Sequence, residues 1–196
     1  MTTELHAAAA ANDSDKIGKL IKAGAKIDAR DKALRTPLLV ATRANALDAA
    51  RVLIEAGADV NAKDNIRDTP FLYAGAEGRL EILRLCLKAG ANLKDTNRYG
   101  GNALIPAAHH GHPETVAELL KTAIDIDHIN RLGWSALLET IILSDGGPIH
   151  RNILKQLIAA GADVNLADGD GVSPLAHAKS RGYGEMISML EEAGAK

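Results

Sequence analysis

Three imidazole side chains occur within four residues of this chain, at His109, His110 and His112. Imidazole is a common ligand of transition metals, so a metal-dependent protein built on this cluster is one hypothesis. Structural zinc sites usually combine histidine with cysteines at set spacing, and the chain has a single cysteine, Cys86. We therefore expect no metal and no cofactor, and keep the metal-dependent protein as the alternative of another class.

Other patterns typical of catalysis are missing from the sequence. It contains no Gly-x-Ser-x-Gly elbow, phosphate-binding loop or dinucleotide fingerprint. Cys86 lies in the apolar run 82–87, where a small buried hydrophobic residue is expected. A reactive thiol needs a partly exposed, electropositive site, which this run does not offer. The sequence therefore predicts a protein that is not an enzyme.

Composition narrows the classes of partner. The 196 residues are 46% hydrophobic but only 3% aromatic, and the formal net charge is −2. This balance provides neither the basic surface nor the stacking aromatics of a nucleic-acid-binding protein. No apolar stretch reaches the ~18–20 residues of a membrane-spanning helix, and the N-terminus lacks a signal-peptide pattern. We expect a cytoplasmic monomer without nucleic-acid or membrane partners, and an exported form with its signal peptide removed stays open.

Regular spacing of glycine predicts the elements that carry these residues. Glycines close a repeated apolar phrase at Gly24, Gly57 and Gly90, which are 33 residues apart, and again at Gly161 and Gly194, which are also 33 residues apart. The 33-residue step after Gly90 falls on Ala123, and Gly161 follows 38 residues later. A fixed period of this length indicates an array of similar units stacked on one another. The glycine follows a helix, where a left-handed conformation costs this residue little.

Two further columns mark where helices begin. Residues with a side-chain oxygen precede the first helix of successive units at Thr36, Thr69, Asn102, Ser135 and Ser173. Such residues accept a free backbone N–H, and a following proline suits the first helical position. Acidic residues fall near the start of the second helix at Asp15, Asp48, Glu81, Glu114 and Glu185, and Asn152 interrupts this column. Each unit is thus predicted to be a helix–turn–helix followed by a turn or short hairpin.

The order Thr-Pro-Leu, helix, Gly-His, second helix, Gly-Ala-Asp-Val-Asn resembles the ankyrin repeat. The resemblance implies an all-α ankyrin-repeat solenoid of about six stacked helix-turn-helix units with hairpin loops, forming a single domain over 1–196. The implied repeats span about 1–28, 29–61, 62–94, 95–127, 128–165 and 166–196. Segment 98–114 is similar to a bacterial branch of the family. The family pattern also accounts for His112 in its Gly-His position, and implies a helix-capping hydrogen bond for His6.

The resemblance implies a protein–protein interaction module that binds an unidentified partner through a concave face. Hairpin tips and the exposed side of the first helices form that face in ankyrin proteins. Tyr, Trp and Arg dominate binding hot spots, and the candidate binding residues are Arg98, Tyr99, Arg131, Trp134, Tyr73 and His109. The alternative is that these side chains only pack on neighbouring hairpins. An inhibitor or immunity-type protein that neutralises a toxin or enzyme is the more specific alternative within binding.

Two adjacent units depart from the pattern. Ala123 replaces the glycine that ends the second helix, and Ile124 replaces the alanine that follows. Held left-handed, Ala123 would add a strain of about 1–2 kcal/mol. The next unit carries five extra residues around 144–148, which can form a second contact or be a tolerated loop extension. We expect the fourth and fifth repeats to open more easily than the second and third.

Overall fold

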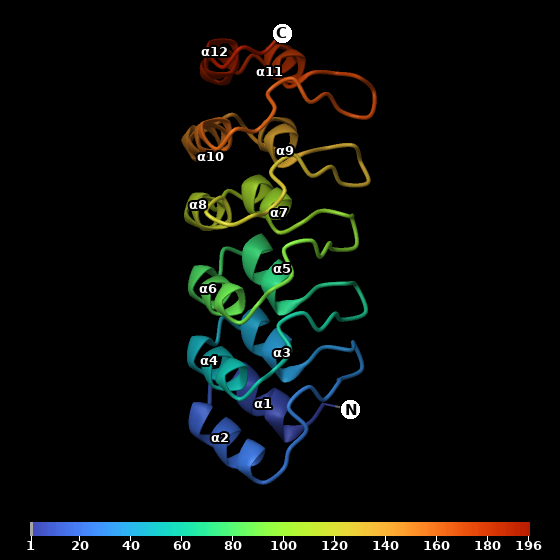
Figure 1. The fold of residues 1–196 in the computed structure, drawn as a ribbon, viewed down its shortest axis with the longest axis vertical. Helices are drawn as coiled ribbons and strands as arrows, with labels where there is room; N and C mark the ends of the chain where they lie inside the picture. Colours follow the sequence, from blue (N-terminus) through green and yellow to red (C-terminus); the bar gives the residue numbers. More distant parts are fainter. Residues whose placement is uncertain (1) are drawn as a thin grey trace. The chain divides into compact units, whose positions relative to one another are not determined.

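The computed structural model describes residues 2–196 and, within them, consists of twelve α-helices without a strand (Figure 1). The helices follow one another in pairs, and a long loop leads from each pair to the next. In chain order they are α1 (Glu4–Ala10), α2 (Ser14–Lys22), α3 (Pro37–Arg43), α4 (Leu47–Glu55), α5 (Pro70–Ala76), α6 (Leu80–Lys88), α7 (Leu104–His109), α8 (Pro113–Leu119), α9 (Ala136–Ile142), α10 (Pro148–Ala159), α11 (Pro174–Arg181) and α12 (Gly184–Glu192).

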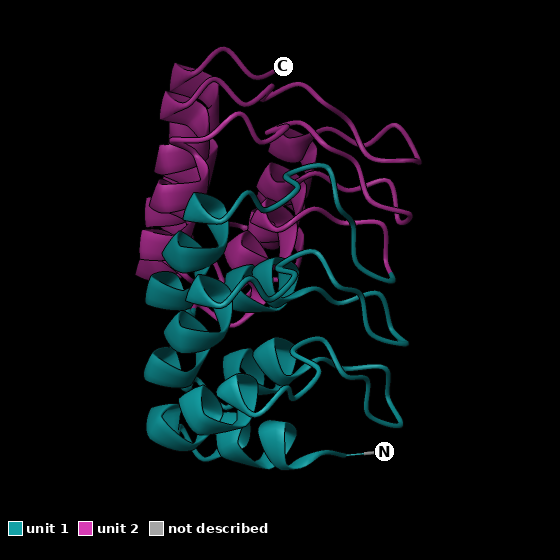
Figure 2. Ribbon diagram, turned by 60° about the horizontal axis from the view of Figure 1, so that its bottom comes forward, with its two compact units in different colours: residues 1–75, 79–98 teal, residues 76–78, 99–196 magenta. Residues whose placement is uncertain are grey.

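The chain divides into two compact units (Figure 2). Unit 1 comprises residues 1–75 and 79–98, and unit 2 comprises residues 76–78 and 99–196. In unit 1, α1 packs on α3, and α2, α4 and α6 pack in succession. In unit 2, α7, α9 and α11 form one layer and α8, α10 and α12 form the other. First helices thus pack on first helices, as the period predicts, whereas the single domain over 1–196 stays a prediction.

Small and branched aliphatic side chains fill the interior of both units. Alanines such as Ala41 and Ala107 are fully buried between neighbouring helices, beside leucines such as Leu53 and Leu137. Small side chains let adjacent helices approach closely, and this close packing favours dispersion contacts. Cys86 is also fully buried, and burial raises the pKa of its thiol to about 12. The interpretation of Cys86 as a small core residue is confirmed.

Side-chain oxygens begin the first helices where the sequence predicts. The hydroxyl of Thr36 accepts the N–H of Leu39 at 3.2 Å ahead of α3, and Ser135 accepts that of Leu138 at 3.3 Å ahead of α9. His6 caps α1, because its Nδ1 accepts the N–H of Thr3 at 3.2 Å. Its Nε2 lies 3.0 Å from the carbonyl oxygen of Arg35 in the next unit. The expected capping role of His6 is confirmed.

The hairpin tips of the second, third, fifth and sixth repeats are each organised by one carboxylate or amide side chain. In the fifth repeat, Asn130 Oδ1 accepts the N–H groups of Leu132 at 2.9 Å and Trp134 at 3.1 Å. Asp31, Asp64 and Asp168 do the same in their own hairpins. In each hairpin these bonds tie two backbone N–H groups, two and four residues further along the chain, to one side chain. The residues displayed at the tips are therefore presented from a defined backbone.

The second helices end in two different ways. The repeated glycines have φ between 85° and 90°, the left-handed ending that the sequence predicts. Ala123 does not have a positive φ, so the left-handed alternative considered for it is wrong. Helix α8 stops at Leu119, and Thr122 Oγ1 donates to the Leu119 carbonyl at 2.6 Å and accepts the N–H of Ile124 at 3.2 Å. The threonine hydroxyl replaces the glycine ending, and the expected strain is absent.

Because Ala123 is not held left-handed, replacing it by glycine relieves no strain. We expect Ala123→Gly to lower the free energy of unfolding by about 0.5–1 kcal/mol, because glycine gains more freedom in the unfolded chain. Thr122→Val should cost about 1 kcal/mol through its lost hydrogen bonds. Urea unfolding of both variants measures these changes. A glycine variant more stable than the parent would contradict this description.

The easier opening of the fourth and fifth repeats stays a prediction, which native-state hydrogen exchange can test.

Candidate binding surface

Tyr99 of the fourth hairpin and the tip of the fifth hairpin lie side by side in unit 2. The backbone N–H of Arg131 donates to the carbonyl of Tyr99 at 2.9 Å, and Asn130 holds the N–H of Trp134. The side chain of Tyr99 is 54% exposed and that of Leu132 is 57% exposed. Arg131 is exposed as well, and Trp134 is half-buried. Three of the predicted binding residues thus gather at adjoining tips.

The first helices add a buried acid to this surface. Asn130, which organises the tip, also donates through Nδ2 to Glu139 Oε1 at 2.7 Å. The other carboxylate oxygen of Glu139 lies 3.6 Å from Nδ1 of His109, the last residue of α7. These contacts connect the hairpin to α9 and α7. We call Tyr99, Arg131, Leu132, Trp134, Glu139 and His109 the unit 2 face.

Glu139 belongs to the candidate surface, and the sequence prediction did not include it. A usable signal was present in the sequence, because position 139 corresponds to Val40, Tyr73, Pro106 and His177 in other repeats. An acid at this point of a first helix is therefore a departure from the pattern. The burial of Glu139 and its contact with His109 arise only from the packing of α9 beside α7.

Burial shifts the protonation of both members of the Glu139–His109 pair. Glu139 is 6% exposed, and loss of hydration raises the pKa of its carboxyl to about 7, against the opposing hydrogen bond from Asn130. Burial also lowers the pKa of the His109 imidazole, and the neighbouring charges of His110 and His150 lower it further. Close to neutral pH this part of the surface can therefore change its charge.

The histidine cluster does not converge on a common point. His110 Nδ1 donates to the carbonyl of Ala76 at 2.6 Å, while His109 faces Glu139. The His112 ring packs on Gly78, where an added Cβ would lie 2.6 Å from its Nδ1. Within residues 2–196, no group of three His, Cys, Asp or Glu side chains is arranged to hold a metal ion. The metal-dependent alternative gains no support from this arrangement.

The remaining two predicted residues belong to unit 1. The guanidinium of Arg43 lies 4.5 Å from the centroid of the Tyr73 ring, a cation–π contact, and 4.0 Å from Asp68. Tyr73 is half-buried on α5. Arg98 is exposed and directly precedes Tyr99 in the chain, at the boundary of the two units. The six predicted residues are therefore distributed over both units.

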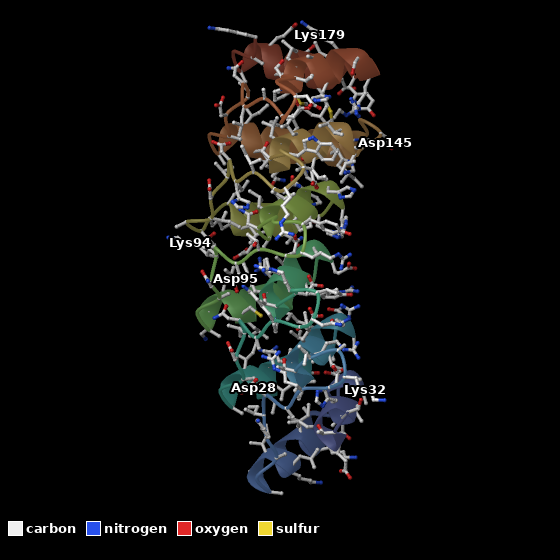
Figure 3. All side chains as sticks on the ribbon, turned by 90° about the vertical axis from the view of Figure 1, so that its right-hand side faces the viewer. Asp28, Lys32, Lys94, Asp95, Asp145 and Lys179 are labelled. Carbon is white, nitrogen blue, oxygen red and sulfur yellow. The ribbon has the colours of Figure 1, made fainter. Side chains whose placement is uncertain are left out.

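The five-residue insertion is an anchored loop. The hydroxyl of Tyr183, ahead of α12, donates to the Ser144 carbonyl at 2.6 Å, and its ring packs on Gly146. Asp145 extends from the ribbon at this loop (Figure 3) and accepts the N–H of Gly147 at 2.8 Å. An open hollow of about 240 Å³ lies along the loop and the start of α10. Its use as a second contact stays a prediction.

None of the helices in residues 2–196 combines the length and apolar character that crossing a membrane requires.

Known proteins resemble this chain over most of its length. The family model of ankyrin repeats, in three copies, matches residues 2–64 and 71–168. The crystal structure of an ankyrin repeat domain from Acinetobacter baumannii AYE is 56% identical, with a TM-score of 0.96 and 98% of each chain covered. The ankyrin repeat protein EF0377 is 39% identical, with a TM-score of 0.92 and 96% of each chain covered.

A curated bacterial relative matches a shorter segment. The putative ankyrin repeat protein YahD of Escherichia coli strain K12 is 41% identical over 58 residues, which are 30% of this chain and 29% of that protein. The structural similarities confirm the all-α ankyrin-repeat solenoid, a fold whose members are typically binding modules without catalytic activity. This chain belongs to the ankyrin repeat family, whose repeats generally mediate protein–protein interactions.

Proposed function

We propose that this protein binds a partner protein through the unit 2 face. The main support is a series of contacts across this surface. Tyr99, Arg131 and Trp134 are joined at the hairpin tips, and Asn130 connects them to Glu139 and His109 on the first helices. Exposed aromatic and aliphatic side chains beside charged groups provide the mixture that binding hot spots use. The backbone of these tips is fixed by hydrogen bonds, which lowers the entropy lost when a partner binds.

Arg98 and Tyr73 are proposed as additional contacts from unit 1. Arg98 adjoins Tyr99 in the sequence, and Tyr73 presents a half-buried ring held by Arg43. In this proposal the chain acts as a monomer in the cytoplasm, and its target is a protein rather than a nucleic acid or a membrane. If the captured partner is an enzyme or a toxin, an assay of its activity with and without this chain tests whether binding also inhibits it.

Alanine substitution at the tips tests the proposed surface. After the partner is identified by pull-down from the native organism, we expect Trp134→Ala combined with Tyr99→Ala to weaken its binding by about 2 kcal/mol or more. Titration calorimetry provides the affinities, and circular dichroism confirms that the variant is folded. The matched control is Ile149→Ala, which removes a 53% exposed side chain at the insertion.

The control separates the two candidate surfaces of the chain. A double variant with unchanged affinity would overturn the assignment of binding to the unit 2 face. A loss confined to Ile149→Ala would instead place the contact at the insertion loop and α10.

A further inference from the structure

Glu139 differs from Asp31 and Asp168 in how its charge is balanced, and from the buried Asp64, whose carboxylate accepts two backbone N–H groups. Asp31 lies 2.7 Å from the guanidinium of Arg35, and Asp168 lies 2.7 Å from His177 Nε2. Glu139 receives one neutral hydrogen bond, from Asn130, and its nearest ionisable neighbour is His109 at 3.6 Å. Among residues 2–196, no lysine or arginine lies within ion-pair distance of this carboxyl. The surface therefore contains a buried acid without a permanent cation.

The ionisable groups on every element around Glu139 are already engaged or face elsewhere. His150 of α10 contacts the carbonyl of His109 through Nε2 at 2.9 Å, and Arg181 of α11 donates to the carbonyl of Ile142 at 3.3 Å. The groups concerned are His109 on α7 and His110 directly after it, His150 on α10, His177 and Arg181 on α11, and Arg131 in the hairpin. Only His109 comes within ion-pair distance of Glu139. Residues 2–196 therefore place no lysine or arginine against this carboxyl.

An acid in this position is costly unless something outside the chain compensates it. An ionised carboxylate loses hydration on burial, and one amide hydrogen bond restores only part of that loss. An aliphatic side chain such as Val40, at the same position of the second repeat, avoids the cost altogether. A cation from a partner would complete the pairing, because a buried carboxylate is strongly stabilised by a charged donor.

We propose that Glu139 recognises a basic side chain, lysine or arginine, of the partner protein, and that docking of this side chain expels a proton from Glu139 to solvent. The inference rests on the proposed function and specifies its chemistry. In the free chain the carboxyl carries a proton for part of the time near neutral pH. On docking, the O–H bond breaks, the proton passes to the buffer, and the carboxylate pairs with the ammonium or guanidinium that the partner already carries.

The surroundings of Glu139 suit such a side chain. The exposed Tyr99 and Leu132 provide apolar surface at the adjoining tips, against which an aliphatic stem can pack. His109 lies 3.6 Å from the Glu139 oxygen that does not bond to Asn130, and its side chain is partly exposed. Its imidazolium, formed at acidic pH, competes with the partner's cation for this oxygen. Acidification thus opposes docking twice, by protonating Glu139 and by charging His109.

The direct test uses defined peptides with the full-length chain. Carboxyl carbons of glutamate are followed by nuclear magnetic resonance while pH is varied, with acetyl-Leu-Arg-Leu-amide at on the order of 10 mM, as millimolar affinity requires. We expect this peptide to lower the titration midpoint of Glu139 by at least half a pH unit. The matched peptide has citrulline, the uncharged analogue, in place of arginine and should leave the midpoint in place. Equal effects of the two peptides, or no effect of either, would overturn the inference.

A second measurement separates this inference from the proposed function. With the identified partner, affinity is measured at pH 6 and pH 8 for the parent chain, for Glu139→Gln and for Trp134→Ala. We expect the parent to bind several-fold more tightly at pH 8, and Glu139→Gln to lose that dependence. Glu114→Gln, an exposed acid in α8, is the control and should retain it. If Trp134→Ala weakens binding while Glu139→Gln behaves as the parent, the basic-side-chain contact is wrong and the binding surface stands. If neither variant weakens binding, both are wrong.

Discussion

Replacing Glu139 by glutamine is expected to raise the free energy of unfolding by about 3 kcal/mol at pH 8 and to change it little at pH 4. The pKa of this carboxyl is raised from its usual 4.5 to about 7 in the folded chain. Each pH unit of such a difference corresponds to about 1.4 kcal/mol. Glutamine keeps the oxygen that accepts from Asn130 and removes the charge. The gain in stability thus comes from removing a buried negative charge.

The direction of the pH dependence follows from the raised value. An acid that binds its proton more tightly when folded contributes its full stability below pH 4.5. That stability is lost as the pH rises towards 7, because the unfolded chain ionises first. The parent chain should therefore lose stability across this interval relative to Glu139→Gln. His109 acts in the opposite sense at low pH, and it is present in both proteins.

Urea unfolding at several pH values provides the comparison. The difference between Glu139→Gln and the parent should grow steadily between pH 4.5 and pH 7 and then level off. The exposed Glu114→Gln should show no comparable change. A difference that stays flat between pH 5 and pH 8 would mean that the Glu139 carboxyl is solvated, contrary to its buried position.

Replacing Gly133 by alanine is expected to destabilise the chain by about 3 kcal/mol, clearly more than the same change at Gly171. Both glycines occupy the same position of their hairpin tips, with φ of 78° and 80°. The left-handed conformation alone costs an alanine about 1–2 kcal/mol. A Cβ on Gly133 would also lie 2.7 Å from the backbone nitrogen of Gly169, while nothing lies within 4 Å of one on Gly171. Overpacking against backbone adds about 1–3 kcal/mol.

Comparing the two variants measures the energetic effect of the close approach between the fifth and sixth hairpins. Gly133→Ala and Gly171→Ala share the conformational penalty, so the difference between their unfolding free energies measures the contact with Gly169. Chemical denaturation of both variants at neutral pH provides that difference. Equal destabilisation by the two substitutions would show that the fifth and sixth tips separate without cost, and that the tips are not held together as described.

The amino-acid sequence by itself determined the repeating architecture, because its signals act over a few residues. Thr36 and Ser135 begin their helices by accepting an N–H three residues ahead, and Gly57 ends one through its own φ. His6 and Cys86 likewise follow from their place in the period. Such local preferences recur in each unit, and their regular spacing was sufficient to predict six helix pairs with hairpin loops.

Only the tertiary structure decided the chemistry of the surface. Glu139 and His109 are 30 positions apart, and their proximity comes from the packing of α9 on α7. The raised pKa of Glu139 depends on how much water its neighbours exclude, which no spacing along the chain specifies. Ala123 does not adopt the left-handed conformation, because the Thr122 hydroxyl bonds to the Leu119 carbonyl and the Ile124 N–H instead. Several endings satisfy the same backbone groups, and the contacts formed in three dimensions select among them.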